Sequence, residues 1–348
     1  MNLFITLLTS FIFAYLAIKV FKPVAINVGL VDKPNERKHH SGHIPLIGGI
    51  SIFIAVLFSS LIWLPNTIEL RMYLIASAMM VFIGAIDDKK DISVRIRIVG
   101  QIIIASLMIY GVGAYISNLG NLFTLGNINL GVLGIFFTYF CIIVTINAFN
   151  MIDGIDGLIG SLSINTFVSI AILFLLSGNK ELISYPLILA VATLPYLMFN
   201  LGLFKQTSRK IFMGDAGSMF IGLSVIWLLT MGTQGDNVTF RPVTALWITA
   251  VPLMDMLAIV MRRVRKGQNP FKPDRDHLHH IFMRVGFSDR QALAAITALA
   301  SIFSLIGILG EVYLVPEWLM LFLFLVLYGL YNLLIKHIWQ VTKLIKSN

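Results

Sequence analysis

Three aspartates stand close together where a long apolar run of the sequence ends. Asp87 and Asp88 are adjacent, and Asp91 follows them. On a helix, Asp87 and Asp91 would share one face, with Asp88 close to Asp91. Magnesium would hold such repelling carboxylates together, because it binds carboxylate oxygens and keeps positions open for substrate phosphates. The alternative is a solvated helix end whose charge Lys89 and Lys90 balance, but acidic residues beside membrane segments are scarce and more often functional.

More carboxylates follow in later motifs. Asp153 and Asp156 are three residues apart in NAFNMIDGIDGL, and Asp215 lies between glycines in FMGDAGS. Either motif alone is compatible with an ordinary polar turn. Together with the first cluster they predict one shared acidic site, in which Asp215 supplies another hard oxygen ligand for a metal. Asp255 lies inside an apolar run, where a structural role is as reasonable as a functional one.

Histidines gather in the longest polar segment of the chain, residues 262–290. His277, His279 and His280 form the pattern HxHH, which can bind zinc. Because no cysteine lies nearby and the carboxylates favour a harder metal, we expect the histidines to contact a substrate diphosphate or to transfer a proton. Arg263 and the other arginines of this loop are suited to anionic groups. The alternative is a solvated loop that happens to be rich in histidine.

A second polar loop, at 31–49, combines Arg37 and Lys38 with three histidines and ends in a pair of glycines. Positive charge on the cytoplasmic side of a membrane explains the basic residues, but not the histidines or the glycines. We therefore expect this loop to contact a phosphate or a lipid headgroup.

The composition indicates the elements that must position these residues. Of the 348 residues, 57% are hydrophobic and only 12% are charged, about half the charged fraction of a soluble domain. This pattern predicts an all-α integral membrane protein in which helices cross the bilayer. Eleven apolar runs are long enough for this, at about 3–21, 44–64, 70–86, 95–115, 130–149, 157–177, 182–201, 216–233, 243–261, 291–310 and 317–336.

The distribution of basic residues predicts how these helices are oriented. With eleven crossings, 23 of the 26 lysines and arginines fall on one side, and only Arg71, Lys180 and Arg241 fall on the other. The positive-inside rule makes the basic side cytoplasmic, with a periplasmic N-terminus and a cytoplasmic C-terminus. The net charge of +9 suits anionic lipid or a polyanionic substrate, and the lack of a basic soluble domain argues against nucleic acid. The whole chain, 1–348, is predicted to be one membrane domain with active-site loops at about 22–43, 87–97, 147–158, 202–216 and 262–290.

The order of the motifs is similar to that of a known family. The chain resembles the polyprenyl-phosphate N-acetylhexosamine-1-phosphate transferases in VDKPNERKHH at 31–40, IPLIGG at 44–49, DDKKDIS at 87–93, NAFNMIDGIDGL at 147–158, FMGDAGS at 212–218 and PDRDHLHH at 273–280. The resemblance runs nearly end to end, and it is closest to the enterobacterial branch that uses UDP-GlcNAc.

The resemblance implies transfer of GlcNAc-1-phosphate from UDP-GlcNAc to undecaprenyl phosphate, with release of UMP and a requirement for Mg²⁺ or Mn²⁺. It implies an enzyme of the bacterial inner membrane, in contact with membrane lipid, that starts a surface polysaccharide such as O antigen or enterobacterial common antigen. The motifs place three groups of residues in the site: catalytic Asp87, Asp88, Asp153 and Asp156; metal-binding Asp215, Asp88 and Asp91; and substrate-binding Asn200, Arg263, Asp274, His277, His279, His280, Asp32, Arg37 and Lys38.

Several alternatives stay open on the sequence. The same chemistry could use another UDP-N-acetylhexosamine or UDP-MurNAc-pentapeptide as donor. Direct in-line displacement is favoured over a route through an aspartyl intermediate, because the lipid phosphate is already largely dianionic near pH 7. A secondary transporter of an anionic metabolite is a different class, but it would carry its ionisable residues near mid-membrane. The sequence decides neither the polysaccharide pathway nor whether the protein is a homodimer.

Overall fold

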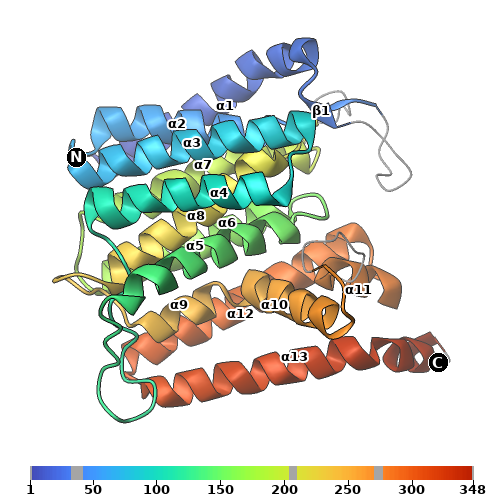
Figure 1. The fold of residues 1–348 in the computed structure, drawn as a ribbon. Coiled ribbons are helices and arrows are strands. Elements are labelled where there is room, and N and C mark those ends of the chain that lie inside the picture. Colours follow the sequence, from blue (N-terminus) through green and yellow to red (C-terminus); the bar gives the residue numbers. More distant parts are fainter. Residues whose placement is uncertain (1, 33–41, 204–209, 270–276, 347–348) are drawn as a thin grey trace.

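The computed structural model is a bundle of helices that run roughly along one axis (Figure 1). It describes residues 2–32, 42–203, 210–269 and 277–346. The helices are α1 (Leu3–Val28), α2 (Gly48–Trp63), α3 (Ile68–Lys90), α4 (Val94–Ser106), the π-helix η1 (Leu107–Val112), α5 (Leu133–Ile152), α6 (Leu158–Leu176), α7 (Ser184–Asn200), α8 (Gly214–Thr233), α9 (Pro242–Ile248), α10 (Ala250–Arg265), α11 (Leu278–Val285), α12 (Asp289–Val312) and α13 (Glu317–Lys346). Two short strands, β1 (Val31–Asp32) and β2 (Ile44–Pro45), pair antiparallel in the first loop.

Each apolar run of the sequence coincides with a helix or with two consecutive helices. Among the described residues, eight helical segments are long and apolar enough to cross a membrane. The α9–α10 pair, which is bent by 80°, makes a ninth candidate, and α2 and α7 are shorter apolar helices. The prediction of an all-α membrane protein is confirmed, whereas the count of eleven crossings stays a prediction.

Helix α8 lies at the centre of the bundle. In its apolar segment 94% of the residues are buried, and the helix packs against α2, α3, α5 and α6. Its hydroxyl side chains need no water, because Ser224 and Thr230 donate hydrogen bonds to carbonyl groups one turn earlier in the same helix. A helix that is hydrophobic on every face is expected in such a position. The packing fixes the first turn of α8 at the end of the bundle where the acidic motifs lie.

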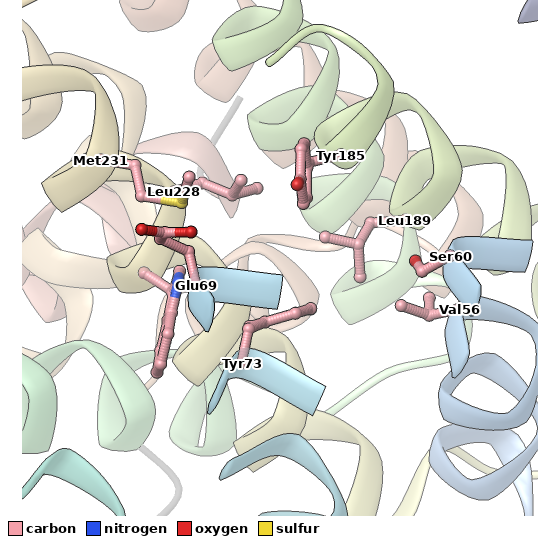
Figure 2. A pocket seen from close by; sticks show the side chains of 9 residues that line it. Val56, Ser60, Glu69, Tyr73, Tyr185, Leu189, Leu228 and Met231 are labelled. Atoms are coloured by element: carbon pink, nitrogen blue, oxygen red, sulfur yellow. The ribbon is translucent and has the colours of Figure 1, made fainter. Parts of the chain in front are cut away.

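A small cavity, shown from close by in Figure 2, lies beside the start of α3, at the end of that helix opposite to Asp87. Glu69 and Tyr73, in the first turns of α3, line it together with Tyr185 and Trp227. The Tyr73 hydroxyl is 2.8 Å from the Ser224 hydroxyl, so this polar group already has a partner inside the protein. On the same helix, Asp87 lies about 27 Å beyond Glu69 and about 21 Å beyond Tyr73, at 1.5 Å per residue. The cavity is therefore remote from the acidic motifs.

Candidate active site

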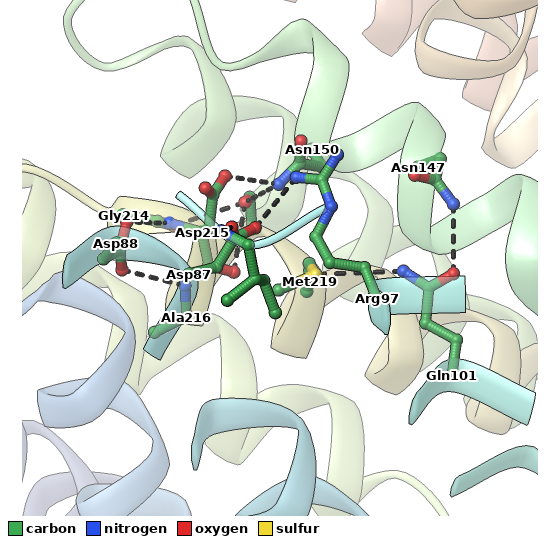
Figure 3. A network of polar contacts seen from close by, with 12 residues as sticks. Asp87, Asp88, Arg97, Gln101, Asn147, Asn150, Gly214, Asp215, Ala216 and Met219 are labelled. Carbon is green, nitrogen blue, oxygen red and sulfur yellow. Dashed lines mark hydrogen bonds and ion pairs between the residues drawn. The ribbon is translucent and has the colours of Figure 1, made fainter. Parts of the chain in front are cut away.

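The first acidic motif meets the start of α8. The carboxylate of Asp88 accepts hydrogen bonds from the backbone N–H groups of Asp215, at 2.7 Å, and Ala216, at 3.2 Å (Figure 3). Gly214 makes this approach possible: its φ is 73°, and a Cβ on it would lie 2.5 Å from Asp88 Oδ2. A carboxylate is favourable at this position, because the N-terminus of a helix carries partial positive charge and unpaired N–H groups. Asp88 thus links α3 to α8.

Asp87 is held by different partners. Its Oδ2 forms an ion pair with Arg97 of α4 at 2.9 Å, and its Oδ1 accepts the Ile92 N–H at 2.9 Å. Asp87 is only 4% exposed, and this pairing offsets part of the unfavourable desolvation of its charge. The sequence reasoning missed Arg97, because the positive-inside rule already explained it. Its place ten residues after Asp87, in the first turn of the next helix, was the available signal.

Asp215 completes the acidic cluster. Asn150, near the end of α5, donates to Asp215 Oδ1 at 2.7 Å and to the Ser218 hydroxyl at 3.0 Å. Asp215 lies close enough to Asp87 and Asp88 to repel both electrostatically. The structure therefore brings together Asp87, Asp88 and Asp215 as predicted, with Asn150 as an additional member.

Asp91 does not join this cluster in the way that the sequence suggested. Helix α3 ends at Lys90, and Asp91 follows in the left-handed conformation, with a φ of 50°. Its side chain is exposed, whereas Asp87 is buried. The two residues consequently do not present one continuous helical face. The reason is local: the carbonyl groups at the end of a helix are often satisfied by such a left-handed cap.

The donor set suits a divalent cation that also binds substrate. Within the part of the chain that the structure describes, no three His, Cys, Asp or Glu side chains form a metal-holding group by themselves. Magnesium usually binds one or two carboxylates and fills its other positions with water and substrate phosphates. Three mutually repelling carboxylates beside Arg97 fit that mode. Each oxygen of Asp88 keeps a second lone pair after capping α8, so Asp88 can still serve as a ligand.

The turn between α5 and α6 carries the second pair of acids. Asp153 directly follows α5 and is exposed, and Asp156 forms an ion pair with Lys210. Asn200, predicted to bind substrate, is buried: its Oδ1 accepts the Gly157 N–H at 2.6 Å, and its Nδ2 donates to the carbonyl oxygen of Ile211 at 3.0 Å. Asn200 thereby connects this turn to the segment that leads into α8.

The histidine motif packs directly on the same turn. A Cβ on Gly154 would lie 2.1 Å from Cε1 of His279, so only glycine leaves room for the ring. The rings of His277 and His279 are parallel at 5.6 Å, and those of His279 and His280 are tilted at 4.2 Å. We call these three rings the histidine column. Burial, together with the neighbouring His280 and His277, lowers the pKa of His279 to about 3.

Asp255 holds the first histidine of this column. The carboxylate lies 2.8 Å from Nδ1 of His277 and accepts the N–H of Leu278, the first residue of α11, at 2.9 Å. It is only 1% exposed. The sequence left Asp255 undecided between structure and function, because its partner lies 22 residues away across a loop.

The other predicted substrate-binding residues are placed only in part. Asp32 is half-buried in β1, and Arg263 is buried in the last turn of α10. Arg37, Lys38 and Asp274 lie outside the described residues. The first loop is tied to the start of α8, since the Phe212 N–H donates to the Pro45 carbonyl and the Phe212 carbonyl accepts the Gly48 N–H, both at 2.9 Å.

Comparison with known proteins identifies the family. Residues 70–233 match the model of Glycosyl transferase family 4. Undecaprenyl-phosphate alpha-N-acetylglucosaminyl 1-phosphate transferases from Yersinia pestis and Escherichia coli (strain K12) are each 46% identical to the chain, over 98% of it and 93% of their own length. That of Haemophilus influenzae is 45% identical over 98% of the chain and 96% of its own length. The chain belongs to glycosyl transferase family 4. The family model spans α3 to α8 and so contains both acidic motifs and Asp215, whereas the first loop and the histidine column lie in regions covered only by the full-length relatives.

Proposed function

We propose that the chain carries out the reaction for which its relatives are named, transfer of N-acetylglucosaminyl 1-phosphate to undecaprenyl phosphate, and that UDP-GlcNAc is the donor. The observation that supports this most strongly is the sequence identity of 45% to 46%, over 98% of the chain, to three transferases of this name. The contacts among the polar segments at one end of the bundle support it further. Both proposed substrates are phosphorylated, and their mutual repulsion must be neutralised before they react. We propose that the product starts a surface polysaccharide such as O antigen or enterobacterial common antigen.

The proposed mechanism is a direct in-line displacement. An oxygen of the lipid phosphate attacks the phosphorus that carries the sugar, and the bond from that phosphorus to the oxygen of UMP breaks. The attacking phosphate is largely dianionic near pH 7, since its second pKa is about 6. We assign Asp87 and Asp88 to orienting the acceptor, with Arg97 restraining Asp87. Asp153 and Asp156 shape the reaction centre from the adjacent turn.

Asp215 is the proposed principal ligand of Mg²⁺ or Mn²⁺, with Asp88 in support. The hydrogen bond from Asn150 orients the Asp215 carboxylate. When bound, such an ion neutralises phosphate oxygens and so favours displacement at phosphorus. The basic and histidine-rich loops, including Arg263, His277, His279 and His280, would bind the nucleotide sugar, while the first loop with Asp32 would face the lipid phosphate.

The proposed topology has eleven crossings, a periplasmic N-terminus and a cytoplasmic active site in the bacterial inner membrane. Two observations support it. Helix α1 begins at one end of the bundle and α13 ends at the other, as an odd number of crossings requires (Figure 1). The polar segments that hold the acidic cluster and the histidine column lie on the side that collects nearly all the basic residues.

A transfer assay on the purified protein tests the proposed function. The assay supplies undecaprenyl phosphate and Mg²⁺, and compares UDP-GlcNAc with UDP-GalNAc and UDP-MurNAc-pentapeptide by release of UMP and by the mass of the lipid product. We expect UDP-GlcNAc to give undecaprenyl-diphospho-GlcNAc at the highest kcat/KM. A higher kcat/KM with either other donor would replace the proposed donor, and no lipid product with any of them would refute the reaction.

A further inference from the structure

Asp255 stands apart from the acidic cluster, yet it has as many polar partners as any acid there. Its Oδ2 faces Nδ1 of His277, and its Oδ1 accepts both the Leu278 N–H and the Tyr331 hydroxyl, the latter at 2.8 Å. A buried carboxylate is unfavourable unless such partners surround it. One oxygen therefore helps to cap α11 and binds α13, while the other is committed to a histidine.

The pairing with Asp255 determines which nitrogen of His277 carries hydrogen. A carboxylate only accepts, so Nδ1 of His277 must donate, and Nε2 on the opposite side of the ring is the nitrogen left for a ligand. The ring is not sealed off, since the side chain of His277 is 10% exposed. In metal and protease sites, a carboxylate behind a histidine fixes the tautomer and orientation of the ring in this way.

The orientation of the His277 ring affects the rest of the histidine column, because the rings pack against one another. The rings of His277 and His279 are within 8° of parallel, and His279 in turn packs on Gly154 beside the acids of the 153–157 turn. Among the described residues, the buried Nδ1 of His279 has no hydrogen-bond partner, which is uncommon for a buried polar atom and often marks a functional position. His279, the middle ring of the column, thus carries an unsatisfied nitrogen beside the 153–157 turn.

We propose that Asp255 is a positioning residue for the transfer reaction: it sets the tautomer of His277 and, through the stacked rings, the place of His279 beside the 153–157 turn. This rests on the proposed function for the reaction that it serves. The competing explanation is purely structural, with Asp255 acting only as a cap for α11 and an anchor for α13.

The substitution Asp255→Asn separates the two roles. Asparagine is a good helix cap, and its oxygen can still accept from Leu278 and Tyr331. Its NH₂ group would then face Nδ1 of His277 and favour the opposite tautomer. We expect kcat with UDP-GlcNAc to fall roughly ten- to hundredfold, as for a misplaced reacting group, with the KM for undecaprenyl phosphate within about threefold of wild type. Tyr331→Phe is the matched control. It removes a bond to the same carboxylate without affecting His277, and should change kcat less than about threefold.

Two further measurements decide the proposal. In a His277→Ala background, Asp255→Asn should lower kcat by less than a further threefold, because its effect acts through His277. Nitrogen-15 NMR of histidine-labelled wild-type protein at pH 8, with His277 assigned by difference from His277→Gln, should show hydrogen on Nδ1. The proposal would be overturned if Asp255→Asn left kcat unchanged, or if Tyr331→Phe lowered kcat as much as Asp255→Asn does. It would also be overturned if Asp255→Asn lowered kcat by the same factor with and without His277→Ala. So would hydrogen on Nε2 in the wild type, even if Asp255→Asn does not fold. A wild type that makes no lipid product would instead refute the proposed function, and the NMR result would still decide the tautomer.

Discussion

Replacement of Gly154 by alanine should displace the histidine column with little other disturbance. The added Cβ would lie 2.1 Å from Cε1 and 2.2 Å from Nε2 of His279, so the ring must move by about 1.3 Å to reach an ordinary contact of 3.4 Å. It cannot swing away freely, since His279 is only 2% exposed and packs between His277 and His280. Gly154 does not have a positive φ, so alanine adds no backbone strain.

The expected effect follows from the size of this displacement. A misplacement of about 1 Å can lower an enzymatic rate by about 10²-fold, equivalent to roughly 2.7 kcal/mol of transition-state stabilisation. We therefore expect Gly154→Ala to lower kcat/KM for UDP-GlcNAc about a hundredfold, while the KM for undecaprenyl phosphate changes far less. Steady-state kinetics in detergent, with each substrate varied against saturating partner, measures both quantities.

Two variants test the reasoning behind this prediction. Gly329→Ala is the control, because a Cβ there meets nothing within 4 Å, and it should have wild-type kinetics. His279→Ala alone should lose roughly ten- to hundredfold in kcat/KM, as expected for a lost charge-assisted contact. Since that change removes the clashing ring, Gly154→Ala/His279→Ala should match His279→Ala. A Gly154→Ala enzyme within twofold of wild type, or a double variant far weaker than His279→Ala, would refute the steric explanation.

Three more predictions concern the metal, the topology and pH. Asp215→Asn should leave a folded protein whose kcat is lower by orders of magnitude, because a charged ligand of the proposed ion is lost; near-normal turnover at ordinary Mg²⁺ would exclude Asp215 from the site. In a Cys141→Ser background, a cysteine at Thr124 should react with an impermeant reagent outside intact cells and one at Gln268 should not; labelling at Gln268 would contradict a cytoplasmic active site. Because the pKa of His279 is lowered to about 3 while an unfolded histidine titrates near 6.5, only the unfolded chain gains this proton between those values. The melting temperature should therefore fall as the pH drops through that window, and it should fall less in His279→Gln than in the wild type between pH 7 and pH 4. An identical pH dependence of the melting temperature in both proteins would contradict the lowered pKa.

The sequence was sufficient to predict the apolar helices and the meeting of the first acidic motif with the start of α8, where Asp215 lies. Apolar runs locate membrane helices well because the bilayer requires each backbone group to bond within its own segment. The acids could be grouped because each lies at the same end of its run. The hydrogen bonds at the start of α8 place Asp88 against Asp215, and Asp87 is adjacent to Asp88 in α3, whereas the catalytic and metal-binding roles of the three residues stay predictions.

Individual partners could not be predicted, because they depend on how helix ends meet. Asp88 caps a helix that begins 126 residues later, at Gly214, and Asp255 pairs with a histidine across a loop. Neither pairing leaves a periodic signal in one sequence. The end of α3 was hard to predict for a related reason, since the left-handed residue after Lys90 is an aspartate and not the usual glycine; the role of Asp91 as a metal ligand stays a prediction.

The end of α5 connects the two halves of the site. Asn150 in its last turn holds Asp215 of the acidic cluster, and Gly154, four residues later, receives His279 of the histidine column. Helix α5 packs against the buried α8 and against α10, which carries Asp255. The separation between the proposed metal ligand and the histidines is therefore set by helix packing and not by the loops alone. A rigid spacing of this kind suits the proposed reaction, because two phosphate groups must be held in one geometry for an in-line displacement.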